Sequence, residues 1–243
     1  MQNVFERIGK SQTLSQEIQE TIEEAILNKT FKPGQKLPTE NEMCDMFGVS
    51  RTALREALQM LSARGLIAVR KGSGIYVEKF DPSHVTKPMR LFLELNFDKN
   101  YVKHIIEVRK MLEPDIVKLA ARNRTNTDLL KMEKTLEDLG ECSETDFEKE
   151  GLIDRDFHLA IANASGNPMI PLIVGPIFNI MPKIRMLVYA TVEQVQNTVL
   201  RDHSRIFEKI KAQDEHGAFR EMSAHLQLAE AHSQIIFQEF ERM

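Results

Sequence analysis

The chain has few of the residues that mark several common protein classes. It contains 2 cysteines in 243 residues, Cys44 and Cys142, which lie far apart and outside any C-x-x-C pattern. This excludes a disulfide framework and a zinc ribbon, and reduced thiols fit a cytoplasmic protein. The 11 glycines and 9 prolines are too few for a fibrous repeat or a disordered chain.

Long apolar runs are also missing. No stretch approaches the ~20 residues that cross a bilayer, and the opening MQNVFERIGK lacks the apolar core of an export signal. We therefore expect no membrane partner. The 42% apolar and 28% charged residues are typical of a folded globular protein, and the length predicts two domains.

Charge is unevenly distributed along the chain. Residues 1–78 hold 10 basic and 10 acidic residues, and residues 79–243 hold 22 and 26, which together give the net charge of −4. Residues 50–77 contain five basic residues and one acidic residue, a local excess of +4. Such a local excess is a candidate footprint for phosphates in spite of the acidic total.

The first part of the chain predicts three helices, of which the second and third are joined by a short turn. Capping-box spacing at Thr13 and again at Thr39 marks two helix starts, over about 13–28 and from 39, with a proline-containing connector at 31–38 between them. After the break at 48–50, Ser50 is a good N-cap for a helix that buries the stripe Leu54, Ala57, Leu58 and Leu61.

Three polar residues in the first two turns of this helix lie outside its apolar stripe. Arg51, Thr52 and Arg55 project outward together, as expected at the reading end of a recognition helix. The β-rich segments 67–69 and 75–77 flank a glycine-containing tip that carries Arg70 and Lys71. The pattern predicts a helix-turn-helix with a small basic wing.

The second part of the chain predicts helices almost throughout. We place a linker at 79–88, where two prolines interrupt a stretch without apolar periodicity, between domains at 1–78 and 89–243. Proline-containing apolar residues 168–190 predict one or two broken helices. The other helices are expected over 100–123, 127–139, 145–163, 192–212 and 215–240. The expected fold is mainly α.

The stretch from FKPGQKLPTE to KGSGIYV resembles the winged helix-turn-helix of the GntR family of bacterial transcriptional regulators. The motifs P-G-x-x-L-P-T-E, G-V-S-R-T-x-L-R-E-A-L and K-G-x-G occur in the family's order. The resemblance implies binding of double-stranded operator DNA, with Ser50, Arg51, Thr52 and Arg55 in the major groove and Lys71 and Gly72 at the wing tip. Chemistry agrees, because arginine contacts guanine bidentately and a glycine tip approaches the minor groove closely.

Asn41 departs from the family pattern. Many relatives have arginine at this point, so one expected contact is changed, although asparagine can still read adenine. The alternative for all of these residues is an ordinary solvated helix face.

Residues 89–240 resemble the all-helical FCD ligand-binding domain of the FadR-like subgroup, through V-R-x-x-L-E-P at 108–114 and D-x-x-F-H at 154–158. The resemblance implies a divalent metal held by Asp154, His158, His203 and His225. Asp154 and His158 are four residues apart and share a helix face. Three imidazoles and a carboxylate favour zinc, with nickel, manganese and iron as alternatives. Without a metal, the histidines would be ordinary hydrogen-bonded residues.

Arg109 lies on an apolar helical stripe, and a buried arginine needs an anion. That anion is either an internal carboxylate or the carboxylate of a small organic acid effector. Arg185 is a second, weaker candidate for the effector. The combined hypothesis is a cytoplasmic, homodimeric repressor that responds to such an acid. The alternatives are a metal-dependent enzyme fused to a DNA-binding domain and a DNA-binding protein in which the metal only stabilises the bundle.

Overall fold

The computed structural model describes residues 12–143, 145–191 and 195–240. The chain divides into two compact units, Met1–His84 and Val85–Met243, and each is considered by itself. Ten helices and one two-stranded sheet are assigned within the described residues. The mainly α class predicted from the sequence is confirmed.

The N-terminal unit contains three helices and a hairpin: α1 Leu14–Leu27, α2 Glu40–Phe47, α3 Arg51–Ala63, β1 Ile67–Arg70 and β2 Gly74–Val77. Both predicted capping boxes are present, because the side chains of Thr13 and Thr39 each accept from the third helical residue while that residue's side chain accepts in return. Ser50 caps α3 by accepting from the backbone N–H of Ala53. These caps fix where each helix begins.

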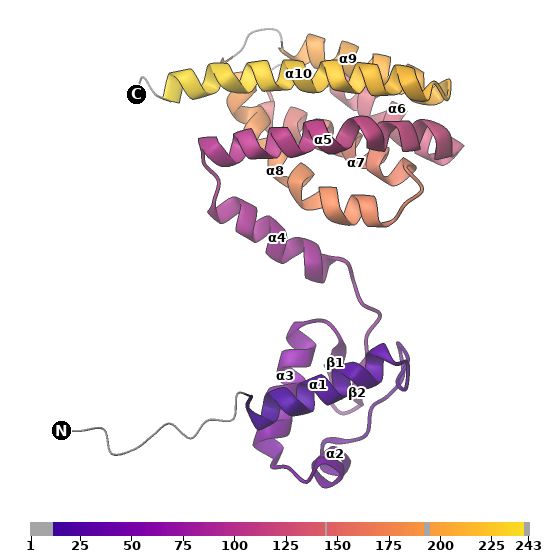
Figure 1. The fold of residues 1–243 in the computed structure, drawn as a ribbon, viewed down its shortest axis with the longest axis vertical. Coiled ribbons are helices and arrows are strands. Elements are labelled where there is room, and N and C mark those ends of the chain that lie inside the picture. The colour runs from indigo at the N-terminus through magenta and orange to yellow at the C-terminus, as the bar shows by residue number, and fades with distance from the viewer. Residues whose placement is uncertain (1–11, 144, 192–194, 241–243) are drawn as a thin grey trace, which may run out of the picture. The chain divides into compact units, whose positions relative to one another are not determined.

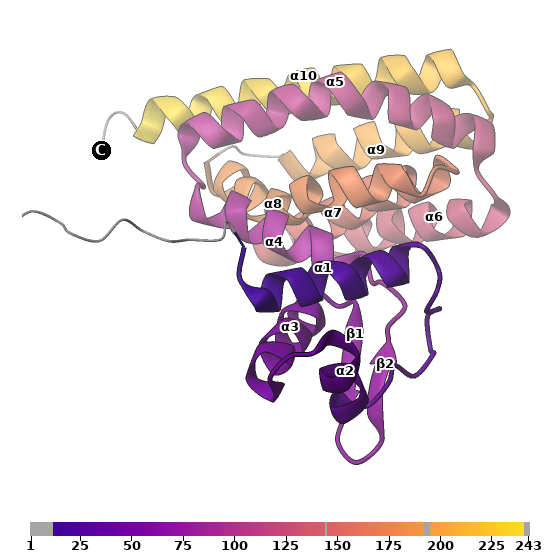
Figure 2. The same ribbon diagram turned by 60° about the horizontal axis from the view of Figure 1, so that its bottom comes forward.

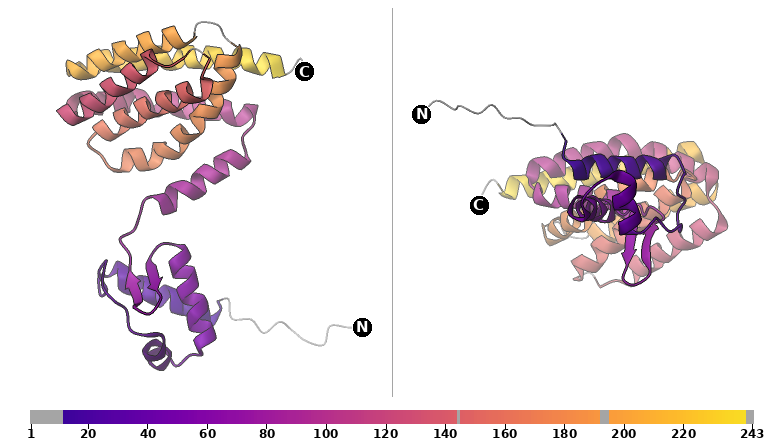
Figure 3. Two further views of the ribbon diagram at one scale, coloured as in Figure 1. Left: turned by 180° about the vertical axis from the view of Figure 1, so that it is seen from behind. Right: turned by 90° about the horizontal axis from the view of Figure 1, so that it is seen from below.

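The core of this unit joins all of its elements. Ile18 and Ile22 of α1 pack with Leu54 and Leu58 of α3 and with Ile75 of the hairpin, and all five are almost fully buried. The two strands pair antiparallel, with Ala68 of β1 opposite Tyr76 of β2. The tip of the hairpin projects beyond the helices of its unit (Figures 2 and 3).

The C-terminal unit is a helical bundle (Figure 1). Its helices are α4 Ser83–Leu95, α5 Lys99–Asn123, α6 Asn126–Gly140, α7 Phe147–Ala164, α8 Met169–Thr191, α9 Val195–Lys211 and α10 Glu215–Phe240. Helix α5 packs along α10, and α7 packs against both α6 and α8. The largest core cluster includes Phe157 of α7, Phe178 of α8, Ile206 of α9 and Leu226 of α10.

Two local predictions differ from the structure. The linker expected at 79–88 is helical from Ser83 onward, and Pro88 lies inside α4. Of the residues 168–190, expected as one or two broken helices, all from Met169 onward belong to the single helix α8, with Pro176 and Pro182 inside it. A proline removes one backbone hydrogen bond, and in α8 the burial of the neighbouring apolar residues outweighs that loss. Residues 192–194 of the predicted helix 192–212 lie outside the described part of the chain.

Helix α8 is long and apolar enough to cross a membrane by length and composition alone. The relevant window, Met169–Met186, has a mean hydropathy of 1.2, and half of it is buried inside the protein. Val174, Phe178 and Ile180 of this window are core residues of the bundle. The window is therefore the central helix of a packed domain.

Candidate functional site

The candidate DNA-reading surface lies at the start of α3. The buried stripe of this helix is the one predicted, Leu54, Ala57, Leu58 and Leu61. Ser50, Arg51, Thr52 and Arg55 are all exposed, so the structure gathers the four predicted residues at one helix start. The Arg55 side chain is 62% exposed, and its Nε donates a 2.9 Å hydrogen bond to Oε2 of Glu40.

The wing presents the two other predicted residues. Lys71 and Gly72 are exposed at the tip between β1 and β2, and Gly72 has a φ of 73°, a conformation that favours glycine. At the end of β1, next to the tip, the Arg70 guanidinium lies 4.7 Å from the Tyr76 ring centroid. Asn41 is exposed on α2. A groove of about 350 Å³ separates the start of α2 from the wing, lined by Lys36, Thr39, Glu40 and Lys71 among others.

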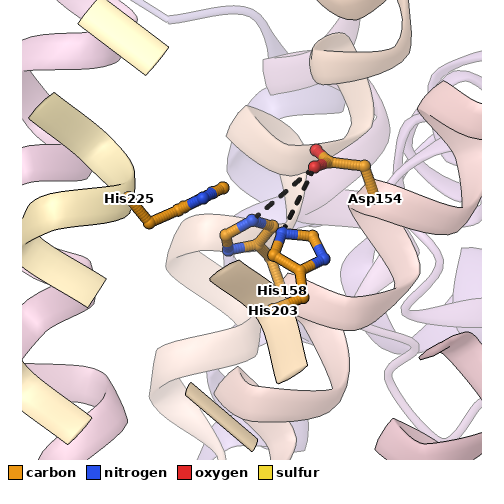
Figure 4. Close-up of side chains that lie close together, drawn as sticks. All are labelled: Asp154, His158, His203 and His225. Atoms are coloured by element: carbon orange, nitrogen blue, oxygen red, sulfur yellow. Dashed lines mark ion pairs between the residues drawn. The ribbon is translucent and has the colours of Figure 1, made fainter. Parts of the chain in front are cut away.

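The predicted metal ligands come together inside the bundle. Asp154 and His158 lie on α7, His203 on α9 and His225 on α10, and each is at most 3% exposed. One potential ligand atom from each lies within 4.8 Å of the others. In Figure 4 the imidazoles of His158 and His203 approach the Asp154 carboxylate, and His225 reaches toward them from α10.

The donor atoms of this cluster fit a divalent metal ion. Oδ2 of Asp154 and the Nε2 atoms of His203 and His225 are buried, and within the described residues none has a hydrogen-bond partner. A buried polar atom without a partner is costly, and a shared cation would satisfy all three at once. Donor atoms around a tetrahedral zinc ion at ~2.1 Å are ~3.4 Å apart, so the four side chains, now within 4.8 Å of one another, would have to draw closer around the ion.

The protonation states also suit metal binding. Burial lowers the pKa of His203 and of His225 well below the ordinary value, which keeps both imidazoles neutral as a metal ligand requires. Burial alone would raise the pKa of Asp154, but the Arg185 guanidinium holds it well below its usual range. The cluster therefore combines the carboxylate anion of Asp154 with neutral nitrogen donors at His203 and His225.

Glu113 is a buried partner of this cluster that the sequence analysis did not single out. Its Oε2 lies 2.6 Å from Nδ1 of His158, and its other oxygen accepts from Nε of Arg109. Burial alone would raise the pKa of Glu113, but Arg109 and His158 lower it to about 2. A carboxylate beside Nδ1 favours the proton there, so Nε2 of His158 keeps a lone pair that accepts from Arg109 here and that a metal ion could use instead. The sequence carries one signal for this contact, because Glu113 follows Arg109 by four residues and so shares its face of α5.

Arg109 and Arg185 both lie at the metal-ligand cluster. Arg109 is 1% exposed, pairs with Glu113 and donates from Nη2 to Nε2 of His158 at 3.3 Å. Arg185 is 2% exposed and donates to Oδ1 of Asp154 at 2.8 Å. Of the two anions considered for Arg109, the structure provides the internal one.

Comparisons with known proteins agree with this arrangement. Residues 14–77 match the gntR family of bacterial regulatory proteins, and residues 104–228 match the FCD domain. The chain is 32% identical to the HTH-type transcriptional regulator LutR of Bacillus subtilis, covering 83% of this chain and 92% of LutR. It is 29% identical to the Glc operon transcriptional activator of Escherichia coli, covering 86% and 84% respectively.

Among solved structures, a Streptococcus agalactiae GntR protein is similar, with a TM-score of 0.65 and 25% identity over 89% of this chain and 99% of that one. The relatives are named as transcriptional regulators, so the chain is a DNA-binding transcriptional regulator and not an enzyme. It belongs to the GntR family of bacterial regulatory proteins and carries an FCD domain behind its winged helix-turn-helix.

Proposed function

We propose that this regulator is a cytoplasmic repressor that releases its operator when a small organic acid binds the C-terminal unit. Arg51 and Arg55 would read guanines in the major groove, with Ser50, Thr52 and Asn41 as further polar contacts. Lys71 and Gly72 would contact the minor groove or its phosphates. The exposure of these residues around a capped helix start supports this assignment.

The metal centre would be held by Asp154, His158, His203 and His225, with zinc as the preferred ion. The unpartnered, buried donor atoms of three of these residues support this proposal. Three nitrogen ligands and one oxygen ligand suit zinc, and nickel, manganese or iron remain chemical alternatives. A bound ion would supply a Lewis-acid position for an oxygen atom of the effector.

Charge balance in the buried cluster supports an acidic effector, and this observation carries the proposal. Arg109 and Arg185 bring two positive charges, and their partners Glu113 and Asp154 bring two negative charges, so these two buried ion pairs cancel. A divalent ion adds +2 in a low-dielectric interior, where uncompensated charge is expensive. A carboxylate effector would offset that charge, and it would compete with Glu113 and Asp154 for the planar donors of Arg109 and Arg185.

The proposed repressor sense requires a winged unit that can bind DNA as it is folded here. Its helices are capped and its reading residues are exposed, so DNA binding requires no further ordering of that unit. An effector that prefers a different arrangement of the dimer would then weaken the operator complex. One relative is named as an activator, so the sense of regulation is a property to be measured for each chain.

We also propose a homodimer, because one recognition helix reads only a half-site and two-fold operators match two-fold dimers. Helix α4 supports this, since Leu91, Phe92 and Leu95 are 56%, 55% and 76% exposed. Several large apolar side chains on one short helix are unusual for a monomer surface. Analytical ultracentrifugation should show a dimer, and a monomer at micromolar concentration would contradict this part of the proposal.

The test of the proposed function is an effector screen. A duplex is first selected by the protein from a randomised library, and its binding to the zinc-loaded protein is followed by fluorescence anisotropy while mono- and dicarboxylic acids are added. We expect at least one acid to weaken duplex binding at least tenfold. If none changes duplex binding, the sensor proposal fails.

A matched pair of variants tests whether the acid binds at Arg109. Arg109→Lys keeps the charge but loses the planar donors, and should reduce the response to the acid. Arg122→Lys on the same helix is the control, because its side chain is 60% exposed and pairs with Glu215. An equal response in both variants would remove Arg109 from the effector site.

A further inference from the structure

Glu40 is an acidic residue in direct contact with a basic residue of the candidate DNA-reading surface. It is the first residue of α2, whose start is fixed by the capping box of Thr39 and Glu42. Its side chain is 33% exposed and accepts from Nε of Arg55 at 2.9 Å. The contact joins two residues 15 positions apart, so it depends on the helix-turn-helix fold rather than on neighbours in the sequence.

The position of Glu40 makes its charge unfavourable for general DNA affinity. The groove that Glu40 lines also contains Lys36 and Lys71, and α3 adds the exposed Arg51 and Arg55. DNA phosphates attract this basic surface whatever the base sequence. A carboxylate in the same place repels phosphates and neutralises part of Arg55. Glu40 therefore lowers the sequence-independent part of DNA binding.

The hydrogen bond to Glu40 also restricts the orientation of the Arg55 side chain. A free arginine side chain samples many rotamers, and ordering it on binding costs conformational entropy. With Nε held by Glu40, the plane of the guanidinium is set and its two Nη groups remain to donate. Two parallel donors of this kind match O6 and N7 of guanine.

We propose that Glu40 is a positioning residue that determines operator selectivity by orienting Arg55 and by penalising non-specific phosphate contacts. The inference rests on the proposed base-reading role of Arg55. A residue that only stabilised the fold would change binding to all duplexes alike. Glu40 should instead change the ratio of affinities for correct and incorrect sequences.

The experiment measures that ratio for the full-length protein. The probes are the duplex selected from a randomised library and a scrambled duplex of the same composition, both at one fixed salt concentration. Glu40→Gln should bind the scrambled duplex several-fold more tightly and the selected duplex no more tightly. Selectivity should fall about tenfold, within the range that one bidentate base contact provides.

Two further variants make the result specific. Asp45→Asn removes an exposed negative charge from the same helix, where Asp45 lines the neighbouring groove with Phe31 and Met46, and should leave the ratio unchanged. Arg55→Ala should lower the ratio, and the double variant with Glu40→Gln should lower it by less than the two single effects combined. Such non-additivity is expected when one residue acts through another.

Each remaining outcome overturns a defined statement. If Arg55→Ala lowers selectivity and Glu40→Gln does not, the positioning role of Glu40 is wrong and the reading role of Arg55 stands. If Arg55→Ala leaves selectivity unchanged, the reading role fails and the inference about Glu40 fails with it. Circular dichroism is the check that each variant is folded. We expect all of them to fold, because the caps at Thr39 and Ser50 are untouched.

Discussion

Glu113 occupies the position from which a carboxylate can control a metal-binding imidazole, since it faces Nδ1 of His158 at 2.6 Å. We predict that Glu113→Gln lowers zinc affinity about 10–100-fold, because partners of this kind typically contribute that much. Titration against a chromophoric chelator measures the affinity. Glu107→Gln is the control, since Glu107 is 50% exposed on the same helix.

The same substitution should also destabilise the bundle. Removing the charge of Glu113 leaves Arg109 buried without its counter-ion, which costs about 3–5 kcal/mol. Zinc affinity is therefore measured at a temperature where the far-ultraviolet spectrum is native. Wild-type zinc affinity in a folded Glu113→Gln protein would show that Glu113 serves Arg109 alone.

The buried histidines predict an acid-sensitive bundle. Burial lowers the pKa of His203 and His225 in the folded state, so the unfolded state binds more protons below its own pKa of about 6.5. Stability is therefore full above pH ~6.5 and falls as the pH drops below it, by up to about 1.4 kcal/mol per pH unit for each histidine.

Urea denaturation of the metal-free protein between pH 7.5 and 5 measures this slope. His203→Asn should remove about half of it, whereas His104→Asn, at a side chain 66% exposed, should leave it unchanged. The carboxylates with lowered pKa values, Asp154 and Glu113, lose their stabilisation only at much lower pH. A flat profile across the range would contradict neutral, buried histidines.

Sequence reasoning at this scale finds residues with a fixed spacing or a family pattern, and misses partners selected by packing. Asp154 and His158 share a helix face, and the structure places His203 and His225 beside them. The need of Arg109 for an anion was evident, but the choice of Glu113 was not, because several carboxylates lie within reach along the sequence. Only the packed bundle shows which one is buried with it.

At the scale of elements, Gly151 of α7 lies directly against the backbone of α8. A Cβ added there would lie 2.9 Å from Cα and 3.2 Å from the carbonyl oxygen of Pro182 on α8, and backbone atoms cannot rotate away. We predict that Gly151→Ala destabilises the bundle by about 1–3 kcal/mol of overpacking, reduced by up to ~1 kcal/mol of helix propensity. Urea denaturation gives the difference.

Gly140 provides the matched control near the end of α6. A Cβ there would lie 3.7 Å from a methyl group of Leu200, which is ordinary contact. Gly140→Ala should therefore be neutral or stabilise by up to ~1 kcal/mol. Equal effects of the two substitutions would mean that α7 and α8 can separate without cost.

Helix starts were predictable and proline-containing segments were not. Thr13, Thr39 and Ser50 mark the starts of α1, α2 and α3 through local hydrogen bonds that the sequence encodes directly. Pro88 and Pro182 lie inside α4 and α8, where the local cost of a proline competes with long-range contacts. For α8 those contacts include buried Phe178 and Ile180, whose partners are distant in the sequence.

At the scale of the whole molecule, the chain has two units with separate hydrophobic cores. The proposed metal ligands all lie in the bundle, and the proposed DNA contacts all lie in the N-terminal unit. A ligand stabilises only the unit that binds it in the folded state. Metal binding and DNA binding are thus expected to stabilise different parts of the protein.

We therefore predict two calorimetric transitions, of which zinc shifts only that of the bundle. At a free zinc concentration 1,000 times the Kd, the stabilisation is about 4.1 kcal/mol, which raises the Tm of a domain of this size by roughly 8–16 °C. The selected duplex should shift only the other transition. His225→Asn is the control, because it removes a ligand and should abolish the zinc shift while leaving the duplex shift intact. A single transition that both ligands raise together would instead mean that the two cores unfold as one, and the effector signal would then pass through that shared stability.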